Sequence, residues 1–148
     1  MNYRRILVGG LLAGVIVNAS EFLLNGVVMA KQMQADMAKH ALVMAGWAMA
    51  GFVIMAFIFG LALAWLYAAF RPRYGQGFRT ALVAAATVWT LSYLLPTTQM
   101  MAMGMGDSPG YLLALVWGAV ELVIAGAVAG YLYREVEAAP AATAVPVG

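Results

Sequence analysis

The sequence predicts an all-α protein, a bundle of four transmembrane helices with both termini on the same side of the membrane. Of its 148 residues, 65% are hydrophobic and only 9% are charged, whereas about 25% are charged in a typical soluble domain. The mean hydropathy is +0.88. Four long apolar runs follow one another, and roughly 20 apolar residues in a helix cross a hydrocarbon core about 30 Å thick. These observations indicate an integral membrane protein.

The predicted spans cover residues 6–30, 42–70, 80–95 and 111–133. The third is the shortest and ends before Pro96, because proline disfavours helical geometry in the residue that precedes it. Continuation of this helix after a kink is the alternative. The second is longer than a bilayer requires, which favours a tilted or projecting helix. We expect one domain over residues 1–137 and a low-complexity tail over 138–148, which has little apolar surface to bury and is expected to be disordered alone.

The charges outside the spans predict the orientation. Six arginines fall on one side of the predicted bundle and two lysines on the other. The positive-inside rule then places both termini in the cytoplasm. The basic side holds Arg4, Arg5, Arg71, Arg73, Arg79 and Arg134, and the opposite side holds Lys31 and Lys39. These cations are too few and too dispersed for a nucleic-acid interface, and the absence of cysteine excludes disulfides and thiolate ligands.

A weak internal repeat predicts two tandem helical hairpins. GlyLeuAlaLeuAlaTrpLeuTyr at 60–67 resembles GlyAlaValAlaGlyTyrLeuTyr at 126–133, although apolar helices also resemble one another through composition alone. Small residues recur four apart in three spans, a spacing that lets helix backbones approach closely. They are Gly10, Gly14, Gly60, Ala64, Gly126 and Gly130. The pattern favours contacts inside the bundle, with contacts to another subunit as the alternative.

Two acidic residues, Glu21 and Glu121, lie near the middle of the first and fourth spans. A carboxylate at the centre of a membrane helix costs about 2.5–3.5 kcal/mol on insertion scales. Because these spans run in opposite directions, both glutamates can lie at the same depth. No basic residue lies within the spans, so we expect protonation, a bound cation or water to offset the cost. The predicted polar seam around them also contains Asn18, Asn25, Thr87 and Thr90.

Two interpretations of this seam stay open. Ionisable groups inside a bilayer usually mark a proton or ion pathway. The alternative is a pair of protonated glutamates that hold the helices together through hydrogen bonds, because burial disfavours the charged form of a carboxyl group.

Methionines form a second candidate site, on the predicted outer side. Thioether and imidazole groups are suitable ligands for Cu(I), and the candidate ligands are Met33, Met37, His40 and Met103. Methionine also packs adaptably, and no typical metal-binding spacing is present. Apolar packing near the headgroups is therefore the favoured interpretation, and we expect no cofactor.

The basic loop between the second and third spans is a third candidate site. Arg71, Arg73 and Arg79 suit an anionic lipid headgroup, although control of topology by positive charge is the favoured interpretation. Short motifs lie in this loop and in two of the spans: LeuTyrAlaAlaPheArgProArgTyrGlyGlnGly at 66–77, AlaGlyValIleValAsnAlaSerGlu at 13–21 and GlyAlaValGluLeu at 118–122. Together they resemble a group of small uncharacterised bacterial membrane proteins. The resemblance implies four helices and a bacterial origin, and therefore helices in the bacterial inner membrane. It implies no particular activity.

The function is expected to be non-enzymatic, because one histidine and two isolated intramembrane acids do not assemble a nucleophile with its base. The first hypothesis is a structural or accessory subunit that packs by its small-residue faces against itself or a larger membrane complex. The alternative is a small proton- or cation-coupled transporter or channel that uses Glu21 and Glu121. Outward-facing Cu(I) binding is a minor alternative. The expected partners are the lipid bilayer and other membrane subunits.

Overall fold

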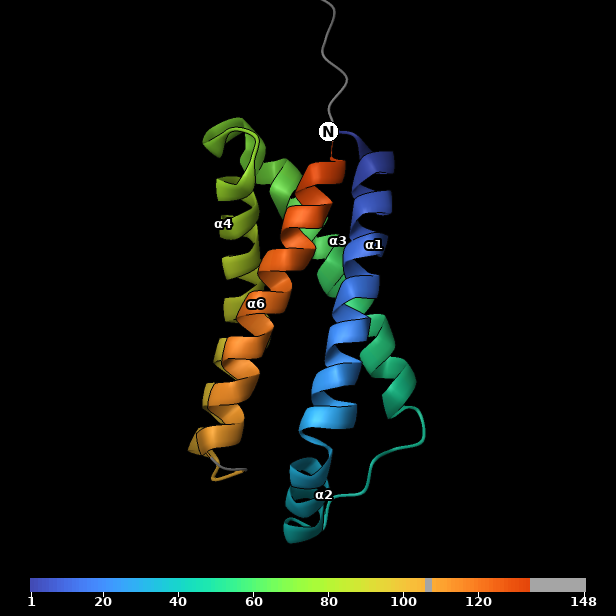
Figure 1. Cartoon of the computed structure of the whole chain (residues 1–148), viewed down its shortest axis with the longest axis vertical. Helices are drawn as coiled ribbons and strands as arrows, with labels where there is room; N and C mark the ends of the chain where they lie inside the picture. Colours follow the sequence, from blue (N-terminus) through green and yellow to red (C-terminus); the bar gives the residue numbers. More distant parts are fainter. Residues whose placement is uncertain (106–107, 134–148) are drawn as a thin grey trace, which may run out of the picture.

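The structure is a computed structural model that describes residues 1–105 and 108–133, and its regular elements are all helical (Figure 1). The chain order is α1 (Tyr3–Leu23), η1 (Leu24–Val28), α2 (Ala30–Lys39), α3 (Ala48–Tyr74), α4 (Phe78–Trp89), η2 (Thr90–Leu94), α5 (Leu95–Ala102) and α6 (Ser108–Leu132). The elements η1 and η2 are single π-helical turns that join helices end to end.

Four helical segments in the described residues are long and apolar enough to cross a membrane. They are Tyr3–Val28, Ala48–Tyr74, Phe78–Ala102 and Pro109–Leu132. With 24 to 27 residues each and a rise of about 1.5 Å per residue, every one exceeds the thickness of a hydrocarbon core. The predicted all-α class, with four helices long and apolar enough to span a membrane, is therefore confirmed.

The helix boundaries differ from the predicted spans in three places. Residues 42–47 are not helical although they are apolar, and α3 instead continues through Pro72 to end before Gly75, which has a φ of +80°. The third span does not stop at Pro96. The π turn η2 precedes this proline, and its wider hydrogen-bonding ring accommodates a helix that continues into α5. The polar stretch after the first span forms a separate helix, α2.

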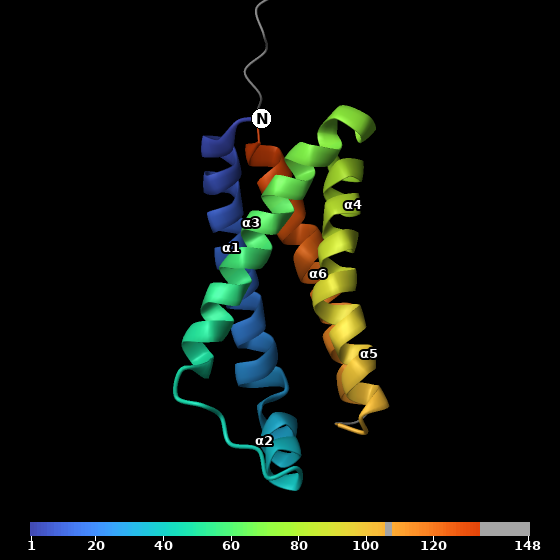
Figure 2. The same ribbon diagram turned by 180° about the vertical axis from the view of Figure 1, so that it is seen from behind.

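The helices pack as two adjacent pairs. α1 packs against α3 and α4 against α6, while α1 also contacts α6 and so joins the pairs (Figures 1 and 2). The start of α1, the α3–α4 turn and the end of α6 lie at one end of the bundle, and α2 lies at the other. The five described arginines therefore lie at the end opposite Lys31 and Lys39. Which side of the membrane each end faces stays a prediction, and Arg134 and the tail at 138–148 lie outside the described residues.

The small residues predicted to mediate packing all face the interior of the bundle. An ideal Cβ on Gly60 of α3 would lie 2.7 Å from the Cα of Gly14 and closer still to the carbonyl oxygen of Gly10, both on α1. Gly126 similarly faces Ala81 on α4, and Ala64 is completely buried. Only a residue without a side chain fits at the α1–α3 crossing, so these faces are occupied by contacts within the chain.

Candidate functional site

Glu21 and Glu121 meet inside the bundle through a third residue, Tyr93. The Tyr93 hydroxyl is hydrogen-bonded to Oε1 of Glu21 and to Oε1 of Glu121. Glu121 is 4% exposed, and Glu21 is half-buried. The three residues come from α1, η2 and α6, so three of the four spanning segments contribute. We call Glu21, Tyr93 and Glu121 the Glu–Tyr–Glu cluster.

A glycine on α6 makes room for the tyrosine ring. An ideal Cβ on Gly118 would lie only 2.5 Å from Cε1 of Tyr93. Gly118 lies three residues before Glu121, and residues at this spacing share a helix face. The same face of α6 therefore provides both the space for the ring and a hydrogen-bonding partner for its hydroxyl. Tyr93 itself lies in η2, whose extra residue changes the direction in which the following side chains project.

Neighbouring hydrogen bonds hold the helices around the cluster. The Asn25 side-chain amide donates to Oε2 of Glu21 at 2.6 Å. The Trp117 indole on α6 donates to the Ser20 hydroxyl on α1 at 2.8 Å, and the Trp89 indole on α4 donates to the Leu115 carbonyl on α6 at 2.9 Å. The two indole bonds connect α6 to α1 and to α4, so they hold together the helices that surround the cluster.

The hydrogen bonds of the cluster require a shared proton. A tyrosine hydroxyl has one hydrogen to donate and lone pairs that accept, whereas an ionised carboxylate only accepts. The hydroxyl of Tyr93 therefore donates to one glutamate, and the other glutamate must itself be protonated to donate back. A cluster with both contacts and a neutral tyrosine thus holds at least one proton on the two glutamates.

The part of the chain that the structure describes offers this pair no basic side chain as a counter-charge. The described spanning segments contain no basic side chain at the depth of the cluster, and Oε2 of Glu121 is buried without a hydrogen bond of standard geometry to any described residue. The Ser20 hydroxyl and the Glu21 carboxyl also lie close to the Glu121 side chain. A buried carboxylate without a counter-charge is costly, and a proton on one of the glutamates lowers that cost.

Three predicted members of the polar seam are not part of this cluster. Asn18 donates to the Gly14 carbonyl at 2.9 Å and to the Val53 carbonyl at 3.4 Å, so it connects α1 to α3. The hydroxyls of Thr87 and Thr90 donate to carbonyls one turn earlier in α4, each at 2.8 Å. Hydroxyl groups in helices commonly satisfy themselves in this way. The seam is therefore narrower than predicted, and Asn25 is the one further predicted residue that contacts a glutamate.

Sequence reasoning missed Tyr93, Gly118 and Trp117. The available signal was a tyrosine within an apolar span, because its hydroxyl needs a partner when it is buried. A glycine one turn from the intramembrane Glu121 was a second signal. Comparisons with protein-family models, curated proteins and solved structures find no match. Function is therefore inferred from the geometry of this chain.

The predicted copper ligands lie in two separate segments at the end of the bundle that carries the lysines. Met33, Met37 and His40 belong to α2 and its C-terminal end, while Met103 follows α5 (Figure 2). Across residues 1–105 and 108–133, no three histidine, aspartate or glutamate side chains gather in a possible metal site. Cu(I) binding by the methionines stays a prediction.

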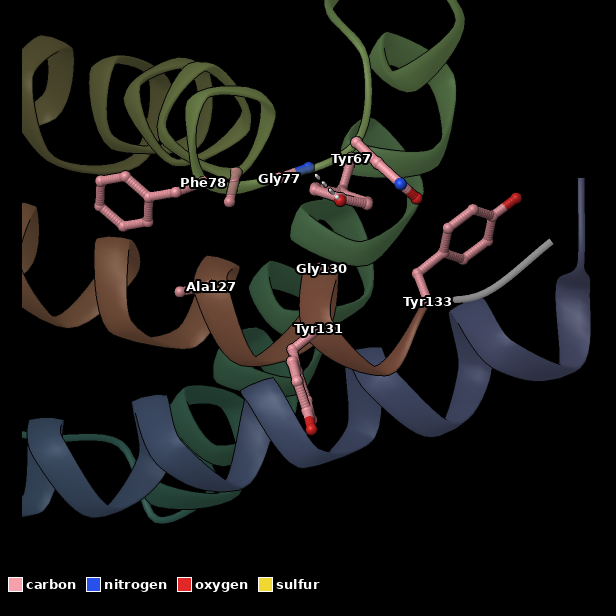
Figure 3. A pocket seen from close by; sticks show the side chains of 9 residues that line it. Tyr67, Gly77, Phe78, Ala127, Gly130, Tyr131 and Tyr133 are labelled. Atoms are coloured by element: carbon pink, nitrogen blue, oxygen red, sulfur yellow. Dashed lines mark hydrogen bonds between the residues drawn. The ribbon is translucent and has the colours of Figure 1, made fainter.

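A pocket of about 400 Å³ lies at the opposite, arginine-rich end, between the α3–α4 turn and the end of α6 (Figure 3). The Tyr67 hydroxyl accepts a hydrogen bond from the Gly77 backbone N–H at 3.0 Å, and the Tyr67 and Tyr133 rings meet edge to face with centroids 6.0 Å apart. The Arg71 guanidinium lies 5.7 Å from the centroid of the Tyr133 ring. Arg73 and Arg79 are exposed at this end. Headgroup binding by the three arginines stays a prediction.

Proposed function

We propose that this chain is a small proton-handling protein of a bacterial inner membrane, with both termini in the cytoplasm. In this proposal the Glu–Tyr–Glu cluster carries a proton during proton conduction or proton-coupled transport. One observation carries the proposal: two carboxyl groups on antiparallel helices meet at one hydroxyl, at a depth where the described residues offer no basic side chain. Acidic groups inside membrane proteins are typical of proton relays.

The contacts favour a proton over a larger cation. Metal cations bind several oxygen ligands arranged around a central position, and Ca²⁺ takes six to eight of them. In the cluster, the tyrosine oxygen and the two carboxylate oxygens are in direct hydrogen-bond contact. This arrangement leaves no space between them for an ion, whereas a proton occupies each contact without additional volume.

The accessory-subunit hypothesis loses one of its motivations. It rested in part on small-residue faces that would pack against another subunit, and those faces are occupied by contacts between α1, α3, α4 and α6. The hypothesis predicts stoichiometric purification with larger subunits and no proton flux through the isolated chain. The flux experiment therefore separates the two functions.

Proton flux into liposomes tests the proposal. The purified chain is reconstituted, a pH gradient is applied, and the internal pH is followed with a trapped fluorescent dye. Glu21→Gln and Glu121→Gln keep the size and hydrogen-bonding capacity of the side chain but remove the titratable proton, so we expect each to lower the flux by about a hundredfold or more. Asp36→Asn is the matched control, because Asp36 lies on α2, outside the cluster.

Two results contradict the proposal. One is a wild-type flux equal to that of empty liposomes. The other is a flux that Glu21→Gln and Glu121→Gln leave at the level of Asp36→Asn, which would reduce the glutamates to packing residues. Retained flux in the Asp36→Asn variant is the expected outcome, because this substitution removes a carboxylate without touching the cluster.

A further inference from the structure

We infer that Tyr93 is the residue that transfers the proton between Glu21 and Glu121, through a hydroxyl that bonds to both. This inference rests on the proposed function and names the group that moves the proton between the two helices. The glutamates each contact the tyrosine oxygen through Oε1. The hydroxyl that bonds to both glutamates therefore provides a path for a proton between α1 and α6.

The transfer balances without any further reactant. In one state Glu121 is protonated and donates to the tyrosine oxygen, while the tyrosine O–H donates to the Glu21 carboxylate. During the step the O–H bond of Glu121 breaks as a new O–H bond forms on Tyr93, and the original tyrosine O–H bond breaks as one forms on Glu21. Tyr93 ends neutral, Glu121 ends as the carboxylate, and no electron is exchanged.

The surroundings restrict the exchange to these three groups. α1 contributes Glu21 as its only acidic side chain, and α6 contributes Glu121. From α3, no acidic or basic side chain lies between Ala48 and Phe70. Asn25 and Ser20 are the polar neighbours, and neither titrates; Asn25 donates to the second oxygen of Glu21. A proton that leaves one glutamate inside the cluster therefore has the other glutamate as its acceptor.

The position of the ring is fixed independently of the hydroxyl. Gly118 leaves the space in which the ring lies, with Cε1 of Tyr93 2.5 Å from the position of an ideal Cβ on that residue. Tyr93→Phe keeps the ring in this space and removes only the hydroxyl. This substitution therefore separates transfer by Tyr93 from its packing against α6.

Infrared spectroscopy of the full chain in lipid nanodiscs, together with the liposome flux assay, tests the inference. Protonated carboxyl groups have a characteristic C=O stretching band that ionised carboxylates lack. At neutral pH we expect this band in the wild-type chain and in Asp36→Asn, and its loss in the double variant Glu21→Gln/Glu121→Gln. In Tyr93→Phe we expect the band to shift, because the hydrogen bond to the phenol is gone, and the flux to fall at least about tenfold.

The outcomes test the inference about Tyr93 and the proposed function separately. A shifted band and reduced flux in Tyr93→Phe support transfer by Tyr93. A band and flux in Tyr93→Phe that both equal the wild type overturn it, while flux that depends on the glutamates still supports proton handling. If the wild-type chain shows the C=O band of a protonated carboxyl group but no proton flux, the proposed function is overturned. The proton bound between the glutamates is then still supported. If Tyr93→Phe does not fold, absence of the band in the wild-type chain at neutral pH overturns the inference.

Discussion

Gly60→Ala is expected to lower the free energy of unfolding by about 1–3 kcal/mol, the usual cost of overpacking a close contact, and Gly60→Val is expected to lower it further. The added Cβ would lie 2.7 Å from the Cα of Gly14 and nearer still to the Gly10 carbonyl oxygen. These are backbone atoms, so α1 and α3 must separate to accept it. Unfolding by SDS in mixed micelles, followed by circular dichroism, measures the loss.

Gly51→Ala is the matched control in the same helix. A Cβ on Gly51 would lie 3.4 Å from the Trp47 ring, with no backbone of another helix within 4 Å. Apart from the gain in helix propensity, the substitution is therefore expected to change the free energy of unfolding by no more than about 0.5 kcal/mol. Equal stabilities of Gly51→Ala and Gly60→Ala would show that α1 and α3 do not cross at Gly60.

Gly118→Ala is expected to lower both stability and proton flux, because its methyl group would displace the Tyr93 ring. The ring is in contact with the position of the new Cβ, so overpacking costs about 1–3 kcal/mol. Movement of the hydroxyl also removes the shared hydrogen-bonding partner of two intramembrane carboxyl groups, which costs roughly another 1–3 kcal/mol. The same unfolding assay and the liposome flux assay measure the two effects.

Gly26→Ala serves as the comparison for Gly118→Ala. A Cβ on Gly26 would lie 3.6 Å from the Phe22 ring, an ordinary van der Waals contact, and Gly26 is exposed in η1. We expect wild-type flux from this variant. Wild-type flux from Gly118→Ala as well would mean that the position of the Tyr93 ring does not control the cluster.

Hydropathy and loop charge were sufficient to predict the coarse architecture. Four apolar runs of sufficient length predicted four spanning helices, and the separation of arginines from lysines predicted which loops share an end of the bundle. The meeting of Glu21 and Glu121 at one depth followed from antiparallel spans with an acid near the middle of each. These features depend on length and on position along a helix axis, which are visible in a sequence.

The rotation of each helix about its own axis could not be predicted from the sequence. Tyr93 faces the glutamates because the π turn η2 changes the phase of the third span, and apolar composition does not reveal such a turn. Thr87 and Thr90 were predicted in the seam because their hydroxyls are polar, but each is satisfied by its own helix. Apolar composition likewise did not distinguish residues 42–47, which precede α3, from the helix itself.

A double-mutant cycle tests the central claim most directly, that Glu21 and Glu121 meet in one cluster. The free energy of unfolding is measured for the wild type, Glu21→Gln, Glu121→Gln and the double variant. Residues in one hydrogen-bonded network show coupling energies of about 0.5–3 kcal/mol, whereas distant residues are additive within about 0.3–0.5 kcal/mol. A parallel cycle of Asp36→Asn with Glu121→Gln is expected to be additive. We predict coupling between Glu21 and Glu121 in the upper range, and additivity in both cycles would contradict the cluster.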